Sequence, residues 1–165
     1  MTSEQAALWS KLAAFTLDAS GAAFPFSHRL ARENLWPLVF ARRVIVEYKR
    51  FIFLGAAAGH PVSPSKAVDQ AWHLHLTYSK SYWNDLCQGL LQRPFHHEPT
   101  QGGAAESLKF DQWYQATLES YRRLFDQSPP SDIWPPRLEP DRLAWVDLNS
   151  YWALPKPRLL RRRRK

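Results

Sequence analysis

The chain has 165 residues, 45% of them hydrophobic and 14% aromatic, so it is long and apolar enough to bury a core as one domain. Its single cysteine excludes an internal disulfide framework and a four-cysteine zinc site. The formal net charge of +7 does not mark a nucleic-acid surface on the body of the protein, because residues 1–155 are formally neutral and the excess lies in the last ten residues.

The first 60 residues predict three helices. Apolar residues at helical spacing indicate a helix over about residues 4–17 and a short one over about 27–34. Trp36-Pro37 marks a boundary, because a residue before proline avoids helical dihedral angles. A long helix follows over about residues 37–58, and Gly59 stands where a left-handed cap is preferred.

A further long helix is expected over about Pro64 to Leu91. Ser63 is a good N-cap, Pro64 fits the first helical position, and Gly89 followed by Pro94 gives stop signals. The pattern of this helix consists of apolar residues at helical spacing: Val68, Ala71, Trp72, Leu76, Trp83, Leu86 and Leu90.

The last predicted helix covers about residues 104–126. The stretch from Gln127 to Pro140 contains five prolines and cannot be regular structure, and Ile133 and Trp134 are expected to pack it against the helices. No alternation typical of strands is sustained anywhere. The predicted fold is therefore all-α, an irregular bundle of four to five helices with a long proline-rich C-terminal extension.

The C-terminal end predicts a boundary between a helical domain (residues 1–155) and a disordered basic tail (residues 156–165). Such a tail either keeps a protein soluble or attracts polyanions such as nucleic acid without sequence selectivity. The residues that would make this contact are Arg161, Arg162, Arg163, Arg164 and Lys165. Since no apolar run reaches the roughly 20 residues of a membrane span and the N-terminus lacks a signal-peptide pattern, a cytoplasmic protein is expected.

Groups capable of chemistry gather between Ser63 and Pro99, which hold four of the six histidines. Asp69 and His73 are four residues apart, so on a helix they share a face. His75 lies about 200° around the helix from His73. On a straight helix at most one of these two histidines therefore binds a given ion. His96 and His97 follow Pro94 in a loop that is expected to cross back over the helix.

The predicted site is a metal centre, because imidazole nitrogens together with a carboxylate suit zinc or ferrous iron. The predicted ligands are Asp69, His73 and His97, with His96 and His75 as alternates. An open coordination position would activate water or dioxygen, but the residues do not specify a reaction or a catalytic residue. The alternative is a non-catalytic interaction module, in which the same side chains form a hydrogen-bond network that fixes the loop on the helix.

The run from Tyr48 to Pro99 resembles the glycine-rich domain-containing protein-like family, and the resemblance extends more loosely over Phe24 to Pro136. The family has no settled activity, so the resemblance implies a functional polar cluster and no particular reaction. This chain differs from the family in its arginine-rich end and in lacking a glycine-rich segment. The residues that carry the resemblance are Pro64, Ser65, Val68, Asp69, Trp72, His73 and His75, then Tyr82 and Cys87, then His96, His97 and Pro99.

Overall fold

The computed structural model describes residues 1–98 and 102–136, and in this part of the chain it contains six helices and no strand. The all-α prediction is confirmed. The expected domain boundary near residue 155 and the basic tail lie outside the described residues. The helices are α1 (Ser3–Ala14), α2 (Phe26–Glu33), α3 (Leu38–Ala57), α4 (Lys66–Thr77), η1 (Lys80–Leu91) and α5 (Ala104–Phe125).

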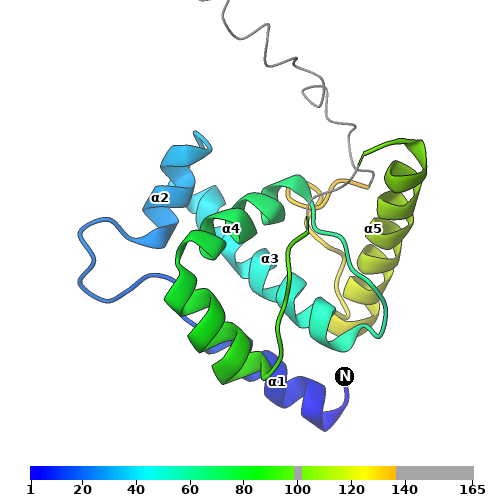
Figure 1. Cartoon of the computed structure of the whole chain (residues 1–165), viewed down its shortest axis with the longest axis horizontal. Coiled ribbons are helices and arrows are strands. Elements are labelled where there is room, and N and C mark those ends of the chain that lie inside the picture. Colours follow the sequence, from blue (N-terminus) through cyan, green and yellow to red (C-terminus); the bar gives the residue numbers. More distant parts are fainter. Residues whose placement is uncertain (99–101, 137–165) are drawn as a thin grey trace, which may run out of the picture.

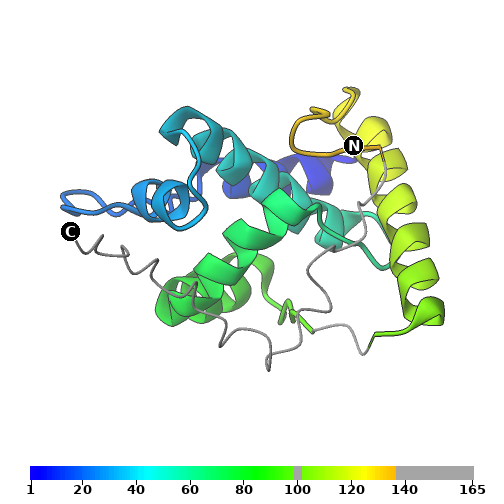
Figure 2. The same ribbon diagram turned by 90° about the horizontal axis from the view of Figure 1, so that it is seen from above.

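Helix α3 lies at the centre of the bundle and packs against α1, α2, α4 and α5. Both views place α2 and α5 on opposite sides of it (Figures 1 and 2). Because four helices pack against α3, it is apolar over a wide face, while Arg42, Arg43 and Val46 of its N-terminal half are exposed. Its C-terminal half contains four consecutive buried residues: Phe51, Ile52, Phe53 and Leu54.

Helix α1 closes one end of the core. The Thr2 hydroxyl accepts the Gln5 N–H, and the Gln5 side chain accepts the Thr2 N–H, so this capping box satisfies two N–H groups at the helix start. Trp9 then packs edge-on against Phe53 of α3 and Phe125 of α5, at centroid distances of 5.8 and 5.1 Å. The N-terminus therefore lies beside the end of α5 (Figure 2).

The predicted single helix over residues 64–91 is wrong, because the chain breaks at Tyr78. Helix α4 begins after Ser65, whose hydroxyl accepts the Val68 N–H, and ends at Thr77. Tyr78 has φ −89° and ψ 60°, outside the helical region. The next helix, η1, is a π-helix. The bundle therefore has one helix more than the upper end of the predicted range.

Contacts with α2 hold Tyr78 at this break. The Tyr78 ring packs edge-on against Phe26 at 5.4 Å, and its hydroxyl accepts a hydrogen bond of 2.9 Å from Arg29 Nε. Phe26 and Arg29 lie about 50 residues earlier in the chain. Helical periodicity within residues 64–91 carries no information about such partners, which is why the break was not predicted.

The segment after α5 packs back onto α3 through Trp134, as predicted. Trp134 is 2% exposed, and its indole N–H donates to Glu47 Oε2 at 2.9 Å. Arg50 donates to the other oxygen of Glu47 at 3.0 Å and also to the hydroxyl of Tyr121 on α5. A buried carboxylate therefore links α3 to the C-terminal segment, and its guanidinium partner links α3 to α5.

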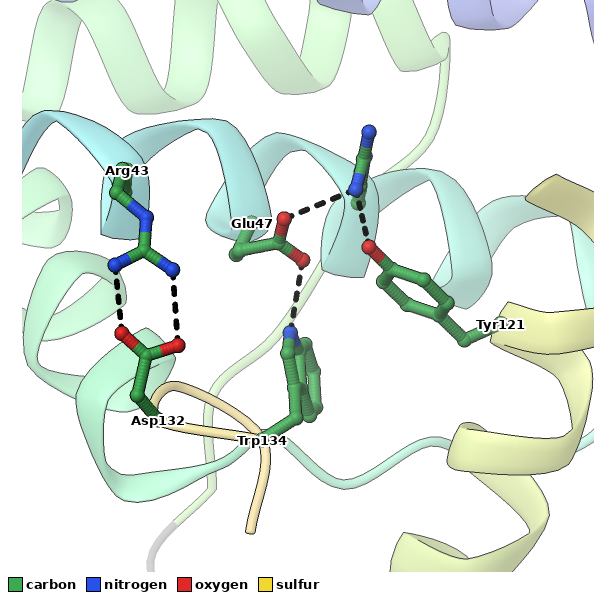
Figure 3. Close-up of polar contacts among 6 residues, drawn as sticks. Arg43, Glu47, Tyr121, Asp132 and Trp134 are labelled. Carbon is green, nitrogen blue, oxygen red and sulfur yellow. Dashed lines mark hydrogen bonds and ion pairs between the residues drawn. The ribbon is translucent and has the colours of Figure 1, made fainter. Parts of the chain in front are cut away.

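A second ion pair joins the same two segments at the surface. Arg43 donates to both carboxylate oxygens of Asp132, at 2.6 and 2.9 Å (Figure 3). About half of each side chain is exposed, 48% for Arg43 and 50% for Asp132. Solvent therefore screens this pair much more than the Glu47 pair.

Within the described residues, no helix is both long and apolar enough to cross a membrane.

Candidate metal centre

Three of the predicted ligands lie together: two are on α4 and the third is in the loop that follows η1. One ligand atom from each of Asp69, His73 and His97 lies within 4.8 Å of the other two. His97 Nε2 is 2.9 Å from Asp69 Oδ1, and His73 Nε2 is 3.6 Å from Asp69 Oδ2. The two imidazole rings are 4.5 Å apart between centroids. A carboxylate from α4 therefore lies between two imidazoles, one from its own helix and one from the loop.

The cluster is open to solvent on one side. The exposed fractions are 49% for the His73 side chain, 28% for Asp69 and 17% for His97. His97 is the least exposed because its ring packs against the edge of Trp72, with 4.5 Å between centroids. Water and small solutes therefore reach the cluster from the side of His73.

His75 belongs to the core and does not join this cluster. It is fully buried, with Tyr48 Oη 2.9 Å from its Nδ1 and Ser81 Oγ 3.1 Å from its Nε2. Burial lowers the pKa of His75 from 6.5 to about 4, so the ring is neutral at physiological pH. Since hydroxyl groups occupy both ring nitrogens, the structure does not support the prediction of His75 as an alternate ligand.

His96 also lies outside the cluster, although it is the neighbour of His97. Its side chain is exposed, and its ring contacts Trp83 of η1 at a centroid distance of 5.8 Å. The two adjacent histidines thus have different partners, and His97 is the one that reaches Asp69.

The loop over residues 92–98 returns from the end of η1 toward α4 (Figure 1). Arg93 donates to the carbonyl oxygen of Gly55 at 2.8 Å. The Phe95 ring stacks on Trp72 at 4.8 Å and lies 5.8 Å from Phe51. A Cβ atom on Gly55 would collide with Cε2 and Cζ of the Phe95 ring, so the ring packs directly against the backbone of α3 at this glycine. Two residues later, His97 reaches Asp69.

The sequence-based prediction did not identify Phe95 and Gly55 as residues that position the site. Phe95 is an unremarkable aromatic residue in a loop, and Gly55 was assigned only to the apolar face of its helix. Cys87 on η1 is 2% exposed, and burial raises the pKa of its thiol, an environment in which a cysteine is usually inert.

Comparisons with protein-family models, with curated proteins and with solved structures found no match. The resemblance carried by Tyr48 to Pro99 therefore stays a prediction. The site is defined by its own geometry as a cluster of two histidines and one aspartate, with donor atoms close enough for one metal ion.

Proposed function

We propose that the protein binds a divalent transition-metal ion, zinc or ferrous iron, through Asp69, His73 and His97. The observation that supports this is the approach of all three donor atoms to within 4.8 Å, from two segments separated by 24 residues in sequence. Zinc and ferrous iron both accept two imidazole nitrogens and one carboxylate oxygen. Because the donor set suits both ions, an experiment has to decide which one the protein binds.

Three protein ligands leave at least one coordination position for water or a substrate. Because His73 is half exposed, this position would face solvent. A metal ion there would lower the pKa of its bound water and so provide a nucleophile near neutral pH. We therefore propose a metal-dependent enzyme, whose substrate the residues of the site do not specify.

A second function is a non-catalytic interaction module, favoured by the 2.9 Å hydrogen bond between His97 and Asp69. In that case the cluster has a structural role, since it fixes the loop over residues 92–98 on α4 without a metal ion. The partners would be acidic molecules bound by the arginine-rich tail, which lies outside the described residues. The two functions differ in whether the cluster takes up metal.

Elemental analysis of protein purified without a histidine tag tests the first function. We expect about one zinc or iron per chain, because the donor set is that of a single ion. His97→Ala is expected to lose the metal and keep its helical circular dichroism, since His97 lies outside the helices. The matched control is His96→Ala, which removes the neighbouring, exposed histidine and should keep the metal.

Thermal melting with and without a chelator provides the second measurement. A metal that binds only the folded protein raises the melting temperature, by an amount that corresponds to about 2.7 kcal/mol at a hundredfold excess over Kd. A chelator should reverse this shift in the wild type and have no effect in His97→Ala. Wild-type protein that contains no metal and takes up neither Zn²⁺ nor anaerobic Fe²⁺ would favour the interaction module.

A further inference from the structure

Helix η1 holds the loop that carries His97 at Phe95, two residues before the histidine. The hydroxyl of Tyr82 donates to the Phe95 carbonyl oxygen, and the backbone of Phe95 also lies beside Cys87. A hydroxyl group of η1 thus holds the carbonyl group of Phe95. Because His97 lies only two residues further on, any shift of Phe95 moves the imidazole relative to Asp69.

The π-helical form of η1 places Tyr82 and Cys87 where they can make these contacts. In an α-helix successive residues turn by about 100°, so side chains five residues apart point about 140° away from each other. In a π-helix the hydrogen bonds join residues five apart, so such side chains lie one turn apart on the same face. The π-helix therefore directs both side chains toward the same loop residue.

The Tyr82 hydroxyl also contacts α4 directly. It accepts a hydrogen bond of 2.8 Å from the indole N–H of Trp72, the residue whose ring packs against both Phe95 and His97. Tyr82 is fully buried, and burial raises its pKa to about 12, so its O–H remains a donor over the physiological pH range. One hydroxyl group therefore connects η1, α4 and the loop.

We infer that Tyr82 is a positioning residue of the metal centre, which sets metal affinity by holding Phe95 and therefore His97 in place. This inference rests on the metal-binding function proposed above. If Tyr82 has this role, the affinity for metal depends on whether the loop is docked on η1. By linkage, metal bound at Asp69, His73 and His97 stabilises the docked loop, and loss of docking weakens metal binding by the same factor.

The test is Tyr82→Phe, with Tyr114→Phe as the matched control. Tyr114 is also fully buried and donates to a loop carbonyl, that of Pro135, and its ring packs against Trp134 of the C-terminal segment. Titration with Co²⁺, followed by its visible absorption, measures affinity and ligand environment. We expect Tyr82→Phe to weaken Co²⁺ binding about tenfold or more, as for residues that orient metal ligands, and Tyr114→Phe to leave it unchanged.

A metal-free measurement separates this inference from the proposed function. In the metal-free protein, the proton chemical shifts of the His97 ring report its position against the Trp72 ring. Tyr82→Phe should move these shifts toward the values of an unstructured histidine, and Tyr114→Phe should not. If the wild type binds no Co²⁺, the proposed function fails. Unchanged His97 shifts and unchanged affinity in Tyr82→Phe, or equal changes in both variants, overturn the positioning role.

Gly55→Ala perturbs the same loop from the side of α3 and leaves the Tyr82 hydroxyl in place. The added methyl group would collide with the Phe95 ring, so the ring must shift from its present position. Alanine favours a helix more than glycine does, so α3 itself should remain intact. We expect the His97 shifts and the Co²⁺ affinity to change in the same direction as in Tyr82→Phe. If Gly55→Ala keeps the wild-type His97 shifts and the wild-type Co²⁺ affinity, Phe95 does not link η1 to the position of His97.

Discussion

Glu47→Ala is expected to destabilise the protein by about 3 kcal/mol, the lower end of the cost of breaking a buried ion pair. Glu47 is 5% exposed and accepts hydrogen bonds from Trp134 and Arg50. Its loss leaves a buried indole N–H without its acceptor and a guanidinium without its carboxylate. Arg50 Nε already has no hydrogen-bond partner among the described residues. The lower end applies because the Arg50 side chain keeps 19% exposure.

Urea unfolding followed by far-UV circular dichroism measures this loss, and Arg43→Ala provides the control. Arg43 also bonds a carboxylate of the C-terminal segment, but solvent reaches about half of both side chains of that pair. The control should therefore unfold near the wild-type midpoint. Equal losses in the two variants would contradict the conclusion that burial of Glu47 makes its contacts with Arg50 and Trp134 important for stability.

The free energy of unfolding is expected to fall as the pH drops from about 6.5 to about 4, because of His75. Burial lowers the pKa of this imidazole from 6.5 to about 4 in the folded state. Between these values the unfolded chain binds a proton that the folded protein does not, so stability rises with pH in this window. The full difference corresponds to about 3 kcal/mol, which is lost once the pH falls through the folded pKa.

His75→Gln removes the titrating group and should flatten this part of the stability–pH profile relative to the wild type. The measurement is urea unfolding at several pH values between 4 and 7. His75→Ala at neutral pH should cost more stability than His73→Ala. Removal of the His75 ring opens a cavity and leaves the Tyr48 and Ser81 hydroxyls without this partner. The His73 side chain, by contrast, is 49% exposed. A profile that keeps its slope in His75→Gln would contradict the assignment to this residue.

Local sequence patterns are enough to predict the all-α class and the extent of most helices. Four predicted helices correspond to α1, α2, α3 and α5 with ends shifted by at most three residues. Helical periodicity and capping depend on residues close in sequence, so they can be recognised without the fold. The same holds for Asp69 and His73, since a spacing of four places both on one face of α4.

Contacts between distant parts of the chain set the arrangement of the segment after His75. Tyr78 leaves the helix where it contacts Phe26 and Arg29 of α2, and the π-helix that follows changes which side chains share a face. A straight α-helix through this region predicted neither the break nor the contacts of η1 with the loop. The decisive interactions join residues that are far apart in the chain.

The choice between the adjacent histidines was also made by the tertiary structure. His97 is the predicted ligand and His96 the alternate, but the spacing in the sequence does not distinguish them. The position of Phe95 against Gly55, Trp72 and Tyr82 directs His97 toward Asp69. The orientation of a loop side chain depends on which distant residues hold its backbone. Local sequence contains no periodic signal for that, whereas side chains along a helix follow a fixed rotation.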